Sequence, residues 1–379
     1  MTTIHWLGAG LSSGPGIRRM ASQSTPLVLW NRTLAKAEEI LGASTKTPAR
    51  VFGAADVEAA LVAGDIVVSM LPAPMHPSIA DICLRKGAHL VTTSYLSDAM
   101  RALHNAAQEK NLCFLNECGL DPGLDHMLAY KLVAEYRSSP TFLQKQTPDE
   151  HTLAFSSCCG GFPRVENDFR YKFSWSPLGV LRALRSPARA VQDGVVKNIA
   201  QPWTATQPFT LGSEKFEMYP NRDSMPYLRE YGFDAAWNVR DFVRGTLRPA
   251  GWRAAWRDVF AHVESDSDVE LAATADRLWK KHAYQDGEAD RVVLAVSLVA
   301  KCTTGEVVFS RSYVVDECGT RDRSAMGLLV SLPATFAIDW ILEGKAPVGV
   351  GGAPRDAATI DDWFLRLARE GVLLRTLES

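Results

Sequence analysis

The sequence predicts an α/β protein with a Rossmann-type, doubly wound parallel sheet and an inserted α+β domain built on an antiparallel sheet. Two observations carry this prediction. Strand-sized apolar runs alternate with helical stretches over the first 126 residues. Near residue 150 the pattern changes to strands in which apolar and polar residues alternate. We therefore expect a first domain over 1–126, completed by about 320–360, and a second, substrate-binding or oligomerisation domain over 127–319.

Composition narrows the class of protein. The 379 residues are 46% hydrophobic and 22% charged, with a net charge of -2, so no global field attracts nucleic acid. The longest apolar runs are strand-sized, such as 292–296, and no signal peptide is recognisable, so we expect no membrane span. Seven cysteines without a C-x-x-C pair, and eight histidines without an H-x-x-x-H pattern, predict reduced thiols, a cytoplasmic location and no metal.

The first strand, over 3–7, runs directly into the stretch Gly-Ala-Gly-Leu-Ser-Ser-Gly at 8–14, and Pro15 suits the first turn of the next helix. Glycines at 8 and 10 allow a tight turn that can approach a pyrophosphate beside a helix N-terminus. The usual third glycine position is Ser13, with Gly14 one place late. We expect cofactor contacts from this turn at Gly8, Gly10, Leu11 and Ser12.

The second strand, over 27–30, ends in Asn31-Arg32-Thr33. A dinucleotide fold places here the acid that binds the ribose hydroxyls of NAD, and this chain has none. A cation flanked by Asn31 and Thr33 suits a 2′-phosphate, which favours NADP(H) as the cofactor. The alternative is that Arg32 is a solvated turn residue that caps the helix over 34–41.

Further strands are expected over 65–70, 88–93 and 112–115. The loops that follow them should share one edge of the sheet with the glycine turn. The candidate cofactor contacts in these loops are Met70, Leu71, Pro72, Ser94 and Leu120. The third loop belongs to the stretch 116–126, in which Pro122 should hold Asp121 extended and Asp125 should cap a helix. An ordinary strand-to-helix turn is the alternative interpretation.

The rest of the chain predicts an α+β domain and closing helices. Strands are expected at 151–158, at 169–175, where aromatic residues alternate with polar ones, and in a hairpin at 292–301 and 306–315. A helical stripe from Trp252 to Phe260 should belong to the core. Helices are then expected near 324–330 and 333–342. A final helix should carry Asp361 and Asp362 at its start, and Arg366 and Arg369 at its end.

Motifs distributed along nearly the whole chain resemble the saccharopine dehydrogenase (L-glutamate-forming) family, also called saccharopine reductases. The two most distinctive are the stretch 119–126 and the turn 219–224. Other matching segments are 92–95, 159–161, 171–177, 244–248 and 324–326. The resemblance implies an NADP(H)-dependent oxidoreductase of amino-acid metabolism, of the lysine-pathway type. Such enzymes form or cleave a secondary amine between an amino acid and an aldehyde, through an imine.

The resemblance also implies roles for individual residues. Asp121 is the candidate acid/base, with water or Cys159 as a relay, and Tyr95 lines the substrate site. Arg222 should bind a substrate carboxylate. The remaining candidate substrate contacts are Asn221, Ser224 and Arg182. The alternatives are a buried apolar role for Cys159, a loop-capping phenol for Tyr95, and an ion pair between Arg222 and Asp223.

One departure from the family leaves the substrate open. Saccharopine-specific members carry an arginine where this chain has Leu178, and Arg182 is a candidate replacement. Two further readings remain: a reductase for another carboxylated imine, such as a carboxynorspermidine-like polyamine precursor, or a non-catalytic NADP-binding redox sensor. A sensor needs only the cofactor loop, so the presence of Asp121, Tyr95 and Cys159 argues against it. The oligomeric state stays open, with a homodimer as one option.

Overall fold

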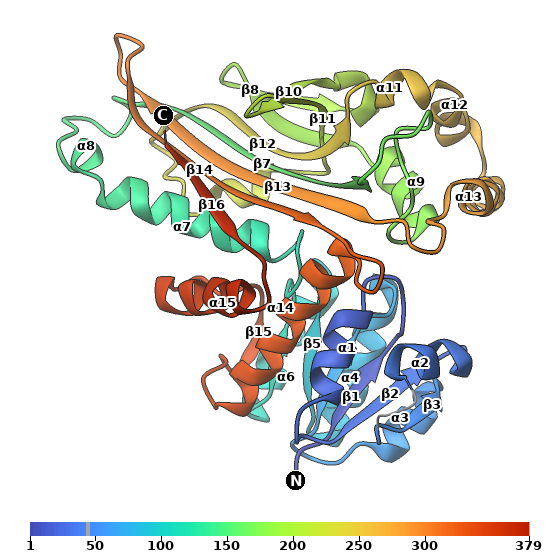
Figure 1. Ribbon diagram of the computed structural model, residues 1–379. Coiled ribbons are helices and arrows are strands. Elements are labelled where there is room, and N and C mark those ends of the chain that lie inside the picture. Colours follow the sequence, from blue (N-terminus) through green and yellow to red (C-terminus); the bar gives the residue numbers. More distant parts are fainter. Residues whose placement is uncertain (43–45, 379) are drawn as a thin grey trace. The chain divides into compact units, whose positions relative to one another are not determined.

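The computed structural model describes residues 1–42 and 46–378, and the chain divides into two units (Figure 1). The first unit comprises Met1–His126 and Gly327–Thr359. The second comprises Met127–Met326 and Ile360–Ser379. The first is built on a parallel sheet and the second on a separate sheet, so the predicted fold class is confirmed.

The first unit contains a parallel sheet of seven strands in the order β15-β6-β5-β4-β1-β2-β3. Its strands are β1 (Ile4–Leu7), β2 (Leu27–Asn31), β3 (Ala49–Val51), β4 (Ile66–Ser69), β5 (His89–Thr92), β6 (Cys113–Leu115) and β15 (Gly349–Gly351). The order changes direction between β1 and β4, which is the switch point where such sheets bind ligands. Strand β15 was not predicted, because a three-residue Gly-Val-Gly run has no recognisable period. It pairs with β6.

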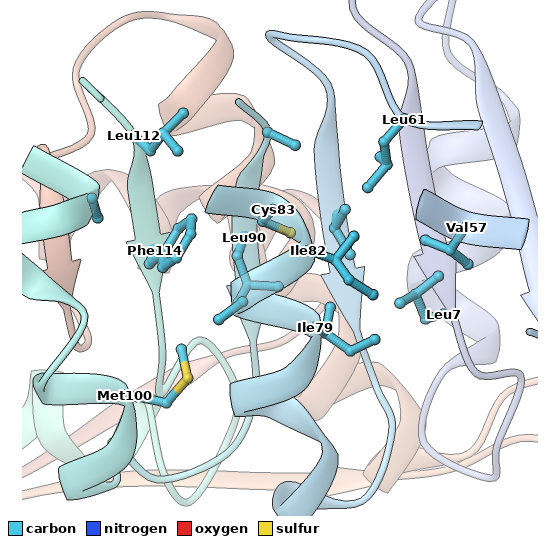
Figure 2. Close-up of a cluster of buried hydrophobic side chains, with 14 of the residues drawn as sticks. Leu7, Val57, Leu61, Ile79, Ile82, Cys83, Leu90, Met100, Leu112 and Phe114 are labelled. Carbon is cyan, nitrogen blue, oxygen red and sulfur yellow. The ribbon is translucent and has the colours of Figure 1, made fainter. Parts of the chain in front are cut away.

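Helices cover both faces of this sheet. They are α1 (Gly14–Ala21), α2 (Leu34–Leu41), α3 (Ala54–Ala60), α4 (His76–Lys86), α5 (Asp98–Arg101), α6 (His104–Glu109) and α14 (Ala325–Leu342), with a 3₁₀ turn, η1 (Ala73–Met75). Figure 2 shows the core on one face, where Leu7, Leu90 and Phe114 from the strands meet side chains from α3 to α6. On the other face the amide of Gly16 in α1 donates to Ser331 Oγ of α14 at 2.7 Å.

Helix α14 differs from the prediction of two separate helices. It continues through Pro333, which has no backbone N–H to donate within the helix. The hydroxyls of Ser331 and Thr335 donate to the carbonyls of Gly327 and Leu332. Within the described part of the chain, α14 is the one helix long and apolar enough to cross a membrane, by length and composition only. Since 72% of it is buried inside the protein, it has the character of a core helix.

The second unit contains a nine-stranded sheet with the main order β10-β11-β12-β7-β13-β14-β16, and β8 and β9 to one side. Its strands are β7 (Thr152–Pro163), β8 (Ala188–Gln192), β9 (Val195–Ile199), β10 (Gln207–Leu211), β11 (Glu214–Pro220), β12 (Asn238–Pro249), β13 (Asp290–Lys301), β14 (Val307–Cys318) and β16 (Leu374–Glu378). The predicted hairpin is β13–β14. The sheet is mixed, because β12 and β7 run parallel. Strand β7 continues past Cys158 to Pro163, and β16 was not predicted.

The helices of the second unit are α7 (Leu124–Ser138), α8 (Pro140–Leu143), α9 (Pro177–Arg185), α10 (Met225–Glu230), α11 (Trp252–Ala255), α12 (Arg257–Ser265), α13 (Asp268–His282) and α15 (Ala357–Arg369), with η2 (Pro202–Ala205). Residues 169–175 do not form the predicted strand. Phe169 stacks on Trp256 and His282, with ring centroids 4.9 and 3.7 Å apart. The alternating aromatic residues therefore pack on helices.

The predicted start of the last helix was also wrong. Helix α15 begins at Ala357, so its first turn carries no acid, and Asp361 and Asp362 lie beyond that turn. The two arginines do lie in the last turn, as predicted.

Candidate active site

The glycine turn after β1 is shaped for a close approach to β4. Gly8 has φ +102°, and a side chain there would begin 3.1 Å from the carbonyl oxygen of Met70. Beside Gly10 the space is open. Helix α1 begins at Gly14, with Pro15 in its first turn, as predicted. The close helix packing usually provided by a third glycine is found at Gly16, where a side chain would collide with Ser331 and Trp6.

The end of β2 presents Arg32 to solvent. Asn31 Oδ1 accepts from the amide of Ala9 at 3.0 Å, and its Nδ2 donates to the carbonyl of Thr33 at 2.8 Å. Asn31 therefore ties the glycine turn to the end of β2. The guanidinium of Arg32 is exposed and contacts no partner among residues 1–42 and 46–378. The alternative that Arg32 caps α2 has no such contact to support it, and the cation remains available to an anion.

The loops after β4, β5 and β6 lie at the same edge, because these neighbouring strands are parallel. The amide of Met70 donates to the carbonyl of Leu7, and Thr93 Oγ1 donates to Met70 Sδ at 3.6 Å. Leu71 is half-buried, Pro72 is exposed and Leu120 is buried. These predicted cofactor contacts therefore share one edge. Contact with a cofactor stays a prediction for each of them.

The structure brings together the two principal predicted residues of this edge. Tyr95 Oη, after β5, donates to Asp121 Oδ1 at 2.6 Å. The loop that carries Asp121 closes on itself, since the amide of Gly119 donates to Pro122 O and that of Leu124 to Gly119 O. The Asp121–Pro122 peptide is cis. A carboxylate and a phenol thus form a short, half-buried pair that is suited to proton exchange with a ligand.

The prediction that Asp125 caps the helix from outside was wrong. Helix α7 begins at Leu124, and Asp125 Oδ1 accepts from the amide of Gly123 at 2.7 Å within the first turn. Gly123 has φ +147°, and a side chain there would collide with the backbone of Gly119. The glycine is therefore required by the closed loop, and Asp125 stabilises that loop.

Two buried side chains behind this pair were not assigned a role from the sequence. Glu117 has φ +58°, and its Oε1 accepts from the amide of Leu96 at 3.0 Å. His126 lies 3.5 Å from Asp125 Oδ2 and 3.9 Å from Glu117 Oε2, and its ring forms a T-shaped contact with that of Tyr95. The sequence offered one signal for Glu117, a carboxylate directly after an apolar strand, because a carboxylate buried there needs a partner.

His76 at the start of α4 was also missed. Its Nδ1 lies 3.0 Å from Ser69 Oγ and its Nε2 lies 2.8 Å from Ser94 Oγ. Burial lowers the pKa of His76 to about 4, so the ring is neutral at neutral pH. The hydroxyl of Ser94, a predicted cofactor contact, is therefore hydrogen-bonded to an uncharged imidazole.

In the second unit, Cys159 lies in the middle of β7, with Leu294 of β13 and Thr246 of β12 beside it. It is 8% exposed, and its relay role stays a prediction. Arg182 is exposed on α9. Leu178, at the position of the family arginine, packs against the aromatic core of this unit.

The turn after β11 holds the other predicted substrate contacts. Its ends are fixed to β12, because the amide of Asn221 donates to Arg244 O and Ser224 Oγ accepts from the amide of Arg244. Arg222 is exposed with φ +56°, and Asp223 pairs with Arg189 at 3.1 Å. Ser224 is fully buried, so its hydroxyl holds the turn.

Arg244 itself was not assigned from the sequence. It is buried, with its guanidinium 4.2 Å from the centre of the Tyr227 ring. A buried cation beside the turn that carries Arg222 is an additional candidate for anion binding.

Comparison with known proteins confirms the resemblance. Residues 4–115 match the Saccharopine dehydrogenase NADP binding domain, and residues 119–372 match the Saccharopine dehydrogenase C-terminal domain. A solved structure of apo saccharopine dehydrogenase (L-Glu forming) from Saccharomyces cerevisiae aligns over the full length of both chains with a TM-score of 0.83. At 24% identity this similarity supports the fold.

Two curated relatives are also named saccharopine dehydrogenase (L-glutamate-forming). The chain is 36% identical over 259 residues to saccharopine dehydrogenase [NADP(+), L-glutamate-forming] of Pyricularia oryzae, covering 66% of this chain and 55% of the relative. The Schizosaccharomyces pombe protein of that name is 26% identical over 99% of this chain and 98% of its own length. The match to the mouse mitochondrial alpha-aminoadipic semialdehyde synthase spans 20% of that protein. The two matched domains together show that the chain belongs to the saccharopine dehydrogenase family, with residues 4–115 as its NADP-binding domain.

Proposed function

We propose that this chain is an NADP(H)-dependent oxidoreductase that forms or cleaves a secondary amine between an amino acid and an aldehyde, through an imine. The observation that carries the proposal is the 2.6 Å hydrogen bond between Tyr95 and Asp121 at the carboxyl edge of an NADP-binding domain. Imine chemistry requires a group that exchanges protons with the substrate nitrogen beside the site of hydride transfer. The pair supplies such a group.

The residues present fit a phosphorylated dinucleotide. Gly8 and Gly10 leave the approach to α1 clear, and the amide of Gly14 at the start of that helix suits the pyrophosphate. The exposed guanidinium of Arg32 suits a 2′-phosphate. When bound, NADPH supplies the hydride.

The chain's own residues then hold the substrate and move the proton. Tyr95 fixes the carboxylate of Asp121 by donating to Oδ1, and Asp121 exchanges the proton with the substrate nitrogen. Arg222 binds a substrate carboxylate, with Asn221, Ser224 and Arg182 as further candidate contacts. Cys159 or a water molecule relays the proton. These roles are proposals by resemblance to the family.

The direct test is turnover. Purified protein is incubated with NADPH, L-glutamate and a panel of aldehydes, and NADPH consumption is followed by absorbance. We expect turnover with an aldehyde that carries an amino-acid group, and much slower turnover with NADH. Amines of the polyamine-precursor class, offered in place of glutamate, test the other carboxylated imine. NADPH binding without turnover on any member of the panel would favour the redox-sensor alternative.

We also propose a cytoplasmic homodimer that binds neither nucleic acid nor membrane. The location is proposed because the seven cysteines include no C-x-x-C pair, a pattern that favours reduced thiols. The net charge of -2 gives no general attraction for phosphate backbones. Sedimentation of the purified protein tests the dimer, and fractionation of cells tests the location.

A further inference from the structure

The hydrogen bonds around His76 determine the direction in which Ser94 can donate. A neutral imidazole has one N–H donor and one acceptor nitrogen, and its tautomer must be inferred from its partners. Here both partners are serine hydroxyls: Ser69 Oγ on Nδ1 and Ser94 Oγ on Nε2. Either hydroxyl can donate or accept, so the two tautomers lead to opposite hydrogen-bond directions along the whole chain.

Burial distinguishes the two tautomers. Ser69 is fully buried, and no residue in the described ranges other than His76 offers an acceptor to its hydroxyl. If Nδ1 carried the proton, the hydroxyl hydrogen of Ser69 would be left unsatisfied in the core, which costs about 1–3 kcal/mol. If Nε2 carries it, Ser69 donates to Nδ1 and Nε2–H donates to Ser94 Oγ. The buried hydrogens of Ser69 Oγ and His76 Nε2 then both have acceptors.

We infer that His76 is a positioning residue: as the Nε2–H tautomer it makes Ser94 Oγ an acceptor, so that the Ser94 hydroxyl hydrogen is directed to an oxygen of the bound ligand. The inference rests on the proposed function, because the ligand is taken to lie at the carboxyl edge of the sheet. The acceptor is a carbonyl or carboxylate oxygen. It belongs either to the carboxamide of the cofactor or to a carboxylate of the substrate.

The surroundings support this assignment. The amide of Ser94 donates to Thr92 Oγ1 at 3.1 Å and its carbonyl accepts from the amide of Glu117 at 3.0 Å, so the backbone of Ser94 is fixed on both sides. Ser94 is half-buried, which leaves its hydroxyl reachable by a ligand. The next residue, Tyr95, donates to Asp121. The neutral ring of His76 therefore orients one donor in the same loop as Tyr95 without adding a charge to this edge.

The first test is the tautomer itself, which requires no turnover. Imidazole ¹⁵N NMR of the protein labelled at histidine, with the His76 signal identified by its loss in His76→Gln, should show protonated Nε2 and bare Nδ1. A protonated Nδ1 would overturn the inference. Ser69→Ala removes the donor to Nδ1 and should weaken the preference for this tautomer.

The second test is a double-mutant cycle. Ser94→Ala and His76→Leu should weaken the same step, and the double variant should be no worse than Ser94→Ala by more than about twofold. His76→Gln, whose amide reaches Ser94, should recover most of the loss, whereas His76→Asn, which reaches only toward Ser69, should not. His89→Leu is the matched control, because His89 accepts from the amide of Cys113 near the start of β5. Independent, additive losses would contradict a role through Ser94.

The affected constant identifies the ligand. A lost hydrogen bond to a neutral carboxamide should weaken NADPH binding, measured by fluorescence titration, by about 2–10-fold. A lost bond to a carboxylate should instead raise the KM for the amino acid by about 10–100-fold. No change in either constant for Ser94→Ala would overturn the inference. The NMR and NADPH titrations remain informative if the proposed substrate proves wrong.

Discussion

The two ends of the parallel strands in the first unit use polar side chains differently. At the amino ends, Asp65 accepts from the amides of Thr3 and Val62, both at 2.9 Å, and lies 3.4 Å from His5 Nε2. His5 Nδ1 in turn accepts from Trp30 Nε1 at 3.2 Å. Each carboxylate oxygen of Asp65 thus has a donor within the protein, and Asp65 is 1% exposed. This edge is a closed network.

At the carboxyl ends the polar groups remain open to a ligand. Tyr95 and Asp121 are half-buried, and Arg32 is exposed. The network around Asp65 therefore stabilises the fold, and the carboxyl ends present groups for binding and catalysis. Substitutions at the two edges should accordingly separate stability from turnover.

The largest expected effect is at the carboxyl edge. Asp121→Asn keeps the size of the side chain and removes the acid, so kcat should fall by about 10²–10⁴, the usual contribution of general acid–base catalysis. NADPH affinity and the melting temperature should change little. Steady-state kinetics measures kcat, fluorescence titration measures NADPH affinity, and thermal unfolding measures the melting temperature. Asp98→Asn, an exposed acid at the start of α5, is the matched control and should keep its kcat within about twofold. Full turnover of Asp121→Asn across the pH range would assign Asp121 a loop role only.

The second prediction concerns pH and uses the contrast between His5 and His76, two of the buried histidines. Burial lowers the pKa of both rings, but Asp65 opposes the shift at His5, whereas the pKa of His76 falls to about 4. Between pH 6.5 and 4 the unfolded chain therefore binds more protons at His76 than the folded protein does. The stability linked to this residue is complete above pH 6.5 and is lost as pH falls toward 4, by about 3 kcal/mol.

Urea unfolding of the wild type and of His76→Gln at several pH values isolates this contribution. The wild type should lose more stability than the variant between pH 7 and pH 4, because the glutamine cannot titrate. Parallel stability curves for the two proteins would show that His76 does not remain neutral in the folded state.

The third prediction returns to the carboxyl edge and the cofactor. Arg32→Leu should weaken NADPH binding by about 1.5–3 kcal/mol, the scale of a hydrogen bond to a charged group, and should affect NADH much less. Fluorescence titration with both cofactors measures the difference. Lys36→Met, which removes an exposed cation one turn further along α2, is the control. Equal affinity of the wild type for NADPH and NADH would contradict the assignment of Arg32 to the 2′-phosphate.

The carboxyl edge was largely predictable from sequence because βα alternation is local. Each strand end could be read from a short window, and Asp121 and Tyr95, predicted from separate loops, lie within hydrogen-bond distance. His76 could not be predicted in this way. Its role depends on serines at the ends of two different strands, and a lone histidine after a proline-rich loop does not reveal them.

The second unit was less predictable because its pairing is long-range. Strand β7 lies between β12 and β13, with Thr152 aligned to Asn238 on one side and Lys301 on the other. A period of two identifies a strand but specifies neither its partner nor its direction, so the parallel β12–β7 pair was missed. The same period over 169–175 produced a false strand, because helices as well as strands can cover alternating aromatic residues.

The smallest expected effect comes from a substitution at the amino ends of the parallel strands, which should change stability but not turnover. Asp65→Asn replaces one carboxylate oxygen by an NH₂ group, which must face either the amide of Thr3 or that of Val62. One part-buried donor is then left without its acceptor, which costs at most about 1–3 kcal/mol. Urea unfolding should show this loss, with kcat and both KM values unchanged. Asp81→Asn, which alters an exposed acid on α4, should change neither.

A loss of stability with unchanged kcat and KM for Asp65→Asn would show that the amino edge stabilises the fold and takes no part in catalysis. The amino ends lie a full strand length from the glycine turn, so a loss of about 1–3 kcal/mol there leaves the geometry at Asp121 intact if the unit unfolds cooperatively. A fall in kcat for Asp65→Asn at temperatures well below its unfolding transition would show that the strands transmit disorder from one edge to the other. The carboxyl edge would then depend on the closed network around Asp65 for its catalytic geometry.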